Sequence, residues 1–339
     1  MDIRLKELGL TSPVALAPLA GITDLPFRRL VAGFGAGLVV SEMVASQEVV
    51  QAKPEARAKA ELDMAGIGTS VQLAGRDAYW MAEAARFVAG QGASRIDINM
   101  GCPAKKVTSG YSGSALMRDL DHALTLIEAV VDAVDIPVTL KTRLGWDDAL
   151  LNAPDLARRA EAAGVRMITI HGRTRCQFYK GHANWGAIGQ VVDAVDIPVL
   201  ANGDIVDTEA AHAALAASGA AGVMVGRGAQ GKPWLLAEIM AGLQGESYDT
   251  GAFRKTLSDI ASAHYDEMLS FYGAALGGKV ARKHLGWYMD TARTPAPLRK
   301  EVLTATPEQV RSLLPIAVQG RNSGYLSTSA TSAYICAAE

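Results

Sequence analysis

The amino-acid sequence predicts an α/β fold, a (β/α)8 TIM barrel followed by a small C-terminal all-helical domain. Eight short apolar runs, each typical of a buried strand, begin roughly 25 to 40 residues apart, which is the length of one βα unit. The second observation is an internal repeat, because Val-Val-Asp-Ala-Val-Asp-Ile-Pro-Val occurs at 130–138 and again at 191–199. Each copy is typical of the end of a helix, a turn fixed by proline and the start of a strand.

The predicted strands are aliphatic and end in polar or glycine-rich residues. They span 14–18, 38–42, 70–73, 96–99, 138–141, 167–171, 199–202 and 222–225. Between them lie Ala- and Leu-rich segments with the amphipathic spacing of outer helices, among them 79–89, 122–134 and 154–163. The alternation of the two patterns predicts a ring of strands inside a ring of helices.

The pattern changes after Trp234. From about residue 253 to 314 no strand-like run remains, and helical segments such as 255–272 and 279–288 dominate. The last residues are rich in Ser, Thr, Ala and Gly, as in poorly ordered tails. We therefore expect a barrel over 1–242, a helical domain over 243–318 and a flexible tail over 319–339.

Composition excludes several classes of protein. The 339 residues are 49% hydrophobic and 20% charged, and no apolar run is long enough to span a membrane. The N-terminus has no apolar stretch like that of a secretory signal, so we expect a cytoplasmic protein. Cys102, Cys176 and Cys336 have no metal-binding spacing, so we expect neither a disulfide framework nor a metal site. The net charge of −2 does not by itself indicate a nucleic-acid partner. We expect the protein to be a monomer.

Polar residues gather where the predicted strands end. In a (β/α)8 barrel these carboxyl ends form the active-site face. The residues at or just beyond them include Gln72, Asn99, Lys141, Arg143, His171, Arg173 and Asn202. Each alone has an ordinary explanation, such as a helix cap, a surface lysine or a structural histidine. Together they predict one site.

Glycine-rich turns follow the last two predicted strands, Asn202-Gly203-Asp204 and Gly226-Arg227-Gly228. Barrels commonly bind phosphate here through backbone N–H groups. The second turn opens a G-x-G-x-x-G string, but it ends the series of βα units instead of starting it, which argues against a dinucleotide-binding fold. A phosphate site together with Lys141, Gln72 and the turn Pro18-Leu19-Ala20-Gly21 suits flavin mononucleotide (FMN).

Cys102 follows the strand 96–99 in the turn Gly101-Cys102-Pro103. A free cysteine is most often a small buried hydrophobe, but a glycine and a proline fix this one at the active-site face. An ordinary thiol, with a pKa of about 8.5, is protonated at neutral pH. Opposite a flavin it would be a general acid, because reduction of a polarised C=C needs hydride at one carbon and a proton at the other.

Six motifs carry a resemblance to a known family. They are Ala-Pro-Leu-Ala-Gly-Ile-Thr-Asp at 17–24, Asn-Met-Gly-Cys-Pro at 99–103, Gly-Ser-Ala-Leu-Met at 113–117, Lys-Thr-Arg-Leu-Gly at 141–145, His-Gly-Arg-Thr at 171–174 and Asn-Gly-Asp-Ile at 202–205. From about residue 10 to 305 the chain resembles the tRNA-dihydrouridine synthases, and within them the bacterial B-type branch. Ser109 and Tyr111 depart from the small-residue loop usual after the Cys-Pro turn, and the tail after about Arg311 matches no family pattern.

The resemblance implies reduction of specific tRNA uridines to 5,6-dihydrouridine, with FMN as cofactor and NADPH as reductant. It implies that Cys102 donates a proton to C5 while hydride passes from flavin N5 to C6. The residues it implies for FMN are Pro18, Leu19, Ala20, Gln72, Lys141, His171, Asn202, Gly203, Asp204, Gly226 and Arg227. Those it implies for the uracil are Asn99, Arg143 and Arg173.

The helical domain has a local excess of positive charge. Residues 279–300 hold six Lys and Arg residues but one carboxylate, Asp290, with Trp287 and Tyr288 among them. Charged faces are usually only solvated, yet with the family resemblance we expect tRNA phosphates to bind this stretch. The expected contacts are Lys279, Arg282, Lys283, Arg299 and Lys300. The target base would have to leave its stack to enter a barrel mouth.

Two other functions stay open. An FMN-dependent dehydrogenase of the dihydroorotate or dihydropyrimidine type would share the flavin and the thiol, but it would leave the basic helical domain without a use. A non-catalytic RNA-binding regulator would need none of Cys102, Lys141 and His171. Comparing activity on free uracil with activity on unmodified tRNA distinguishes the dehydrogenase from a tRNA-dihydrouridine synthase. The absence of bound flavin and of NADPH oxidation would favour the RNA-binding regulator.

Overall fold

The computed structural model describes residues 1–53, 69–248 and 256–319. The chain forms two compact units, Met1–Tyr248 and Asp249–Glu339. The division lies close to the predicted boundary at residue 242. The predicted tail over 319–339 lies, except for Gln319, outside the described residues.

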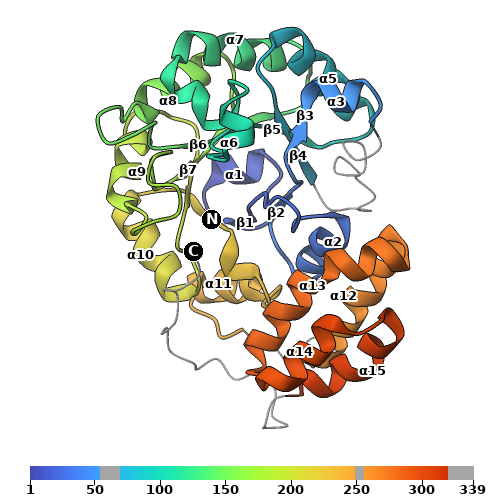
Figure 1. Cartoon of the computed structure of the whole chain (residues 1–339). Coiled ribbons are helices and arrows are strands. Elements are labelled where there is room, and N and C mark those ends of the chain that lie inside the picture. Colours follow the sequence, from blue (N-terminus) through green and yellow to red (C-terminus); the bar gives the residue numbers. More distant parts are fainter. Residues whose placement is uncertain (54–68, 249–255, 320–339) are drawn as a thin grey trace. The chain divides into compact units, whose positions relative to one another are not determined.

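Eight parallel strands close into a barrel in the first unit (Figure 1). β1 (Val14–Leu16) lies between β2 (Leu38–Val40) and β9 (Gly222–Val225), and β2 also pairs with β4 (Thr69–Ala74), which closes the ring. The other strands follow in chain order, β5 (Arg95–Met100), β6 (Val138–Arg143), β7 (Met167–His171) and β8 (Val199–Asn202). The predicted (β/α)8 barrel is confirmed.

A short strand that the sequence did not predict, β3 (Val44–Ala45), continues β2 along β4. The break between them falls at Ser41, whose N–H donates to the Ser70 carbonyl (2.9 Å) and whose Oγ accepts from the Gln72 N–H (3.0 Å). Glu42 comes next, and its Oε2 accepts from the N–H of Gly21 (2.7 Å). The interruption therefore supplies the carboxylate that holds the loop after β1.

Helices surround the strands (Figure 1). They are α2 (Leu25–Gly33), α3 (Ser46–Val50), α5 (Ala78–Gly90), α7 (Leu120–Val131), α8 (Ala153–Ala162), α9 (Trp185–Val192), α10 (Thr208–Ser218) and α11 (Leu235–Leu243), with short turns α6 (Lys105–Thr108), η1 (Gly113–Arg118) and η2 (Arg227–Ala229). Aspartates cap several N-termini, as Asp77 does by accepting from Trp80 N–H (3.1 Å) at α5. The repeated segment ends α7 and α9 and starts β6 and β8, as predicted.

The N-terminal helix α1 (Ile3–Glu7) closes one end of the barrel. Leu5 and the neighbouring Leu8 are buried and pack with inward residues near the starts of several strands, including Met167 and Leu200. This leaves the carboxyl ends of the strands as the face that can admit a ligand.

The second unit consists of four helices in its described part, α12 (Leu257–Tyr272), α13 (Ala274–Thr291), α14 (Ala296–Thr304) and α15 (Pro307–Ala317). Thr256 and Thr306 begin α12 and α15 with capping boxes. Gly277 lets α13 approach α12 closely, because a Cβ there would lie 2.7 Å from the Met268 carbonyl oxygen. Across the described residues, no helix combines the length and the apolar character needed to cross a membrane.

Two histidines lie in the core of the helical unit. His264 and His284 are 1% and 2% exposed, and their rings pack edge to face with centroids 4.7 Å apart. His264 Nδ1 lies 2.8 Å from the Tyr288 hydroxyl. Burial lowers the pKa of His284 to about 4 and holds the pKa of His264 well below its usual range.

We expect the helical unit to lose stability in mild acid. His284 takes up a proton near pH 6.5 in the unfolded chain but only near pH 4 when folded, so the folded state binds fewer protons between these values. The free energy of unfolding should therefore fall by roughly 3 kcal/mol more between pH 6.5 and 4 in the wild type than in a His284→Leu variant. Urea denaturation across this range, followed by circular dichroism, measures the difference, and parallel pH profiles would contradict it.

Candidate active site

The carboxyl ends of the strands bring the predicted side chains together. Direct strand partners include Asn99 with Lys141, Arg143 with His171, and His171 with Asn202. The remaining predicted residues follow the strand ends: Pro18, Leu19 and Ala20 after β1, Cys102 after β5, Arg173 after β7, Gly203 and Asp204 after β8, and Gly226 and Arg227 after β9. Gln72 lies within β4.

Hydrogen bonds fix the Cys102 turn on both sides. Asn99 Oδ1 accepts from the N–H groups of Gly101 (3.2 Å) and Cys102 (3.0 Å). The Cys102 carbonyl accepts from the N–H (3.1 Å) and the Oγ (2.8 Å) of Ser114. Gly113 is required beside it, because its φ is +60° and a Cβ there would lie 2.8 Å from the Cys102 carbonyl oxygen. The half-buried thiol is thus held by a rigid backbone at the mouth.

A chain of side-chain hydrogen bonds supports Asn99 from inside the barrel. Asn99 Nδ2 donates to Gln72 Oε1 (2.7 Å), and Gln72 Nε2 donates to Asp97 Oδ2 (2.7 Å). Thr139 Oγ1 donates to Asp97 Oδ1 (2.6 Å). Burial raises the pKa of Asp97. Asp97 and Thr139 were not among the predicted site residues, although polar residues alternate with isoleucines in the strand that holds Asp97.

Lys141 lies on the neighbouring strand and is half-buried. Its Nζ donates to Asn202 Oδ1 (3.0 Å), and Asn202 Nδ2 donates to the Met224 carbonyl (2.8 Å). Burial, with the charge of Arg143 as the second cause, lowers the pKa of Lys141 to about 8. An anion bound nearby would reverse part of this shift and favour the charged amine.

Arg143 ties the loop after β7 to the Cys102 turn. Its Nε donates to the Gly101 carbonyl (2.7 Å), and its Nη1 donates to the carbonyls of Thr174 (2.9 Å) and Phe178 (2.8 Å). No described residue accepts from Nη2, which leaves that nitrogen for a ligand. Burial lowers the pKa of Arg143 to about 10. Its predicted contact with uracil stays a prediction.

Arg173 is 2% exposed and makes its hydrogen bonds within the protein. Its Nη2 donates to Asp204 Oδ2 (2.7 Å) and the Gly181 carbonyl (2.6 Å), and its Nε donates to the Lys180 carbonyl (3.1 Å). The third nitrogen, Nη1, lies 3.3 Å from His171 Nε2. These contacts position the loop after β7. The predicted contact of Arg173 with uracil stays a prediction.

The His171 imidazole lies with its Nε2 toward the Arg173 guanidinium. Because an arginine can only donate, His171 Nε2 accepts from Arg173, and the ring proton is on Nδ1. Burial, followed by the charges of Arg143 and Lys141, holds the pKa of His171 well below its usual range. Gly203, with a φ of +112°, packs against this ring, since a Cβ there would lie 2.8 Å from His171 Cδ2.

Positive charge exceeds negative charge at this side of the mouth. The charges of Lys141, Arg143, Arg173 and Arg227 all act on His171, and the Asp204 carboxylate pairs with two of them, 2.7 Å from Arg173 and 3.7 Å from Arg227. Such a donor set, next to the turns after β8 and β9, fits a phosphate.

Tyr179, which was not among the predicted residues, also lies beside the arginines of this face. Its ring is 48% exposed, and the guanidinium carbons of Arg143 and Arg227 lie 5.5 Å and 5.3 Å from its centroid. Tyr179 belongs to the loop after β7 and not to a strand end. The only sequence feature that could have pointed to it was the aromatic pair that it forms with Phe178.

The predicted RNA-binding residues lie in the second unit. Lys279, Arg282 and Lys283 on α13 and Lys300 on α14 are exposed. Arg299 differs from them, because its Nη1 contacts Asp290 Oδ1 (2.6 Å) and the Gly286 carbonyl (2.7 Å). The structure therefore shows Arg299 linking α14 to α13, and its predicted RNA contact stays a prediction.

Comparison with known proteins gives consistent matches. The chain is 64% identical over 307 residues to the "Probable tRNA-dihydrouridine synthase" of Rhodobacter capsulatus, covering 90% of this chain and 94% of that protein. It is 44% identical over 301 residues to "tRNA-dihydrouridine synthase B" of Pseudomonas putida, covering 85% and 86%. Among solved structures, a FabK mutant from Thermotoga maritima matches with a TM-score of 0.44 and 17% identity, covering 68% of this chain and 66% of that one.

The family model "Dihydrouridine synthase (Dus)" matches residues 15–319, which cover most of each unit. This match and the relatives confirm the resemblance carried by the six sequence motifs, including its B-type branch. The chain belongs to the dihydrouridine synthase family.

Proposed function

We propose that this protein reduces specific uridines in tRNA to 5,6-dihydrouridine, with FMN as cofactor and NADPH as reductant, acting as a cytoplasmic monomer. The observation that carries the proposal is the rigid Cys102 turn beside a cationic barrel mouth. A thiol fixed by Asn99 and Ser114 suits directed proton donation, and the cations suit a phosphorylated cofactor. The names of the relatives support tRNA as the substrate.

The residues present fit a flavin mononucleotide. Lys141 is a half-buried amine that donates to Asn202, and His171 keeps an N–H at Nδ1, so both can donate to an anionic or carbonyl-rich ligand. The residues that would hold FMN are Pro18, Leu19, Ala20, Gln72, Lys141, His171, Asn202, Gly203, Asp204, Gly226 and Arg227. When bound, FMN would supply the hydride that C6 of the uracil receives, with NADPH as the reductant.

The protein's own residues would supply the proton and the positioning. Cys102 Sγ would donate its proton to C5, on the carbon next to the one that receives hydride. The second N–H of Asn99 and the Nη2 of Arg143 would hold the uracil carbonyls, and Arg173 would keep the loop after β7 in place. Lys279, Arg282, Lys283 and Lys300 would contact tRNA phosphates, so binding would weaken with added salt.

Purified full-length protein tests the proposal. We expect bound flavin, and we expect NADPH oxidation coupled to dihydrouridine formation on unmodified tRNA but not on free uracil, with nucleosides measured by mass spectrometry. Turnover on free pyrimidines alone would favour a dehydrogenase of the dihydroorotate or dihydropyrimidine type. The absence of both flavin and NADPH oxidation would favour a non-catalytic RNA-binding protein.

A further inference from the structure

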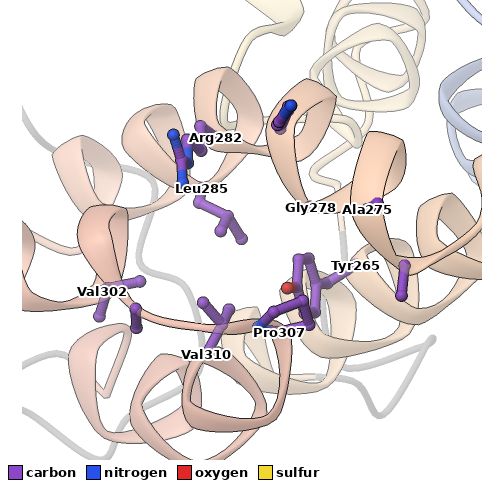
Figure 2. A pocket seen from close by; sticks show the side chains of 11 residues that line it. Tyr265, Ala275, Gly278, Arg282, Leu285, Val302, Pro307 and Val310 are labelled. Carbon is purple, nitrogen blue, oxygen red and sulfur yellow. The ribbon is translucent and has the colours of Figure 1, made fainter.

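The four helices of the second unit line a pocket of about 140 Å³ that belongs to this unit alone (Figure 2). Its walls are largely apolar, with Leu285 from α13, Val302 from α14, and Pro307 and Val310 from α15. An apolar protein cavity of about 150 Å³ admits benzene. The pocket therefore has room for one six-membered ring.

A buried polar group faces this space. The Tyr265 side chain is 2% exposed, and no described residue forms a hydrogen bond with its hydroxyl. Figure 2 shows the Tyr265 oxygen turned toward the pocket, and a Cβ at Gly278 would lie 3.9 Å from it. Burial raises the pKa of Tyr265, so the hydroxyl stays protonated at neutral pH. A ring carbonyl or ring nitrogen in the pocket would give this hydroxyl the partner it lacks.

Two cations also line the pocket. Lys279 and Arg282 lie one helical turn apart on α13, are exposed, and form no ion pair with any residue of the described ranges. Arg299 and Arg311 in the same unit, in contrast, are paired with Asp290 and Asp266. The pocket thus combines a ring-sized apolar space, a deep hydroxyl and unpaired positive charge.

We propose that this pocket binds one unstacked pyrimidine nucleotide of tRNA, with its base beside Tyr265 and its phosphate on Lys279 and Arg282. We choose a pyrimidine because the pocket volume matches a single six-membered ring, and a bicyclic purine is larger. The inference rests on the proposed function for its choice of tRNA, and it concerns a second nucleotide, not the uridine reduced in the barrel. Holding that nucleotide would select one location on the tRNA, which phosphate attraction alone does not do.

Two substitutions test the pocket in the full-length, flavin-loaded protein. Tyr265→Phe removes only the hydroxyl. Gly278→Met fills the space with a flexible, helix-favouring side chain, whose Cβ would meet Pro307 Cγ at an ordinary 3.5 Å. We expect fluorescence anisotropy to show tRNA binding weakened about fivefold by Tyr265→Phe and tenfold or more by Gly278→Met, with melting temperatures near that of the wild type.

Matched controls lie on α5 of the barrel unit. Tyr79→Phe changes an exposed tyrosine, and Gly90→Met adds a side chain where a Cβ meets nothing within 4 Å. Both should bind tRNA within twofold of the wild type. Wild-type tRNA affinity of the two pocket variants would overturn the proposal.

Binding of free nucleotides shows whether the pocket takes a nucleotide of tRNA or a free nucleotide. If uridine 5′-monophosphate binds the wild type but not Gly278→Met, while tRNA affinity is the same for both, the assignment to tRNA is overturned. Equal binding of adenosine 5′-monophosphate would overturn the choice of a pyrimidine. Dihydrouridine formation is measured in parallel. If the wild type forms none, the proposed function is contradicted, while the binding data still test whether the pocket holds a pyrimidine nucleotide.

Discussion

Replacing Cys102 by alanine is expected to lower turnover on tRNA by about 10²- to 10⁴-fold, the usual contribution of a positioned general acid. The flavin should stay bound, because the contacts that fix this turn use the backbone of Cys102 and the side chains of Asn99 and Ser114. Turnover is measured as dihydrouridine formed under saturating NADPH, and flavin content by absorbance after purification.

Cys176→Ala is the matched control for this prediction. Cys176 is exposed, and its N–H is held by the Trp146 carbonyl (2.9 Å), so the loss of its thiol should leave turnover unchanged. If Cys102→Ala turned over at the wild-type rate, Cys102 would not be the general acid. A loss of flavin together with turnover would instead indicate that the thiol supports the fold of the site.

Arg173→Met is expected to lower the free energy of unfolding by about 3 kcal/mol, the lower end of the range for breaking a buried ion pair, since Asp204 is partly exposed. The substitution removes one of the donors to the Asp204 carboxylate, which keeps the Ala183 N–H (2.7 Å), and it leaves the Lys180 and Gly181 carbonyls without the guanidinium. Arg173→Lys should recover only part of the loss, because an ammonium group cannot reproduce the planar fork of contacts. Urea denaturation of the full chain measures both values.

The same variants decide between two roles for Arg173. A double variant, Arg173→Met with Asp204→Asn, should cost less than the sum of its single changes if the two side chains act as a pair. A loss below 1 kcal/mol for Arg173→Met, with a raised KM for tRNA, would instead support the contact with uracil that the resemblance implies.

The sequence was sufficient to predict the barrel and the location of most site residues. Gln72, Lys141, His171 and Asn202 all lie in or at the ends of strands, and a local alternation of apolar and polar residues fixes where a strand ends. Once eight such strands close into a barrel, their ends must meet at one face. The break at Ser41 and the extra strand β3 have no comparable local signal.

The roles of the two buried arginines could not be predicted in the same way. Arg143 and Arg173 donate mainly to backbone carbonyls of the loop after β7, such as those of Phe178 and Gly181. Every residue has a carbonyl, so the sequence gives no sign of which ones a guanidinium will reach. Tyr179 was missed for a related reason, because its place between Arg143 and Arg227 depends on the path of that loop.

The hydrogen-bonded side chains Asp97, Gln72 and Asn99 would also bear on which pyrimidine the proposed uracil site accepts. Gln72 donates to Asp97 from its NH2 group, so its oxygen is the group that accepts from Asn99, and the Asn99 oxygen accepts from the Cys102 turn. The hydrogen-bonding group that Asn99 keeps for a ligand is therefore an N–H. It can receive a ring carbonyl but would oppose an exocyclic amino group. Asp97, which reaches Asn99 through the two hydrogen bonds of Gln72, would thus favour uracil over cytosine.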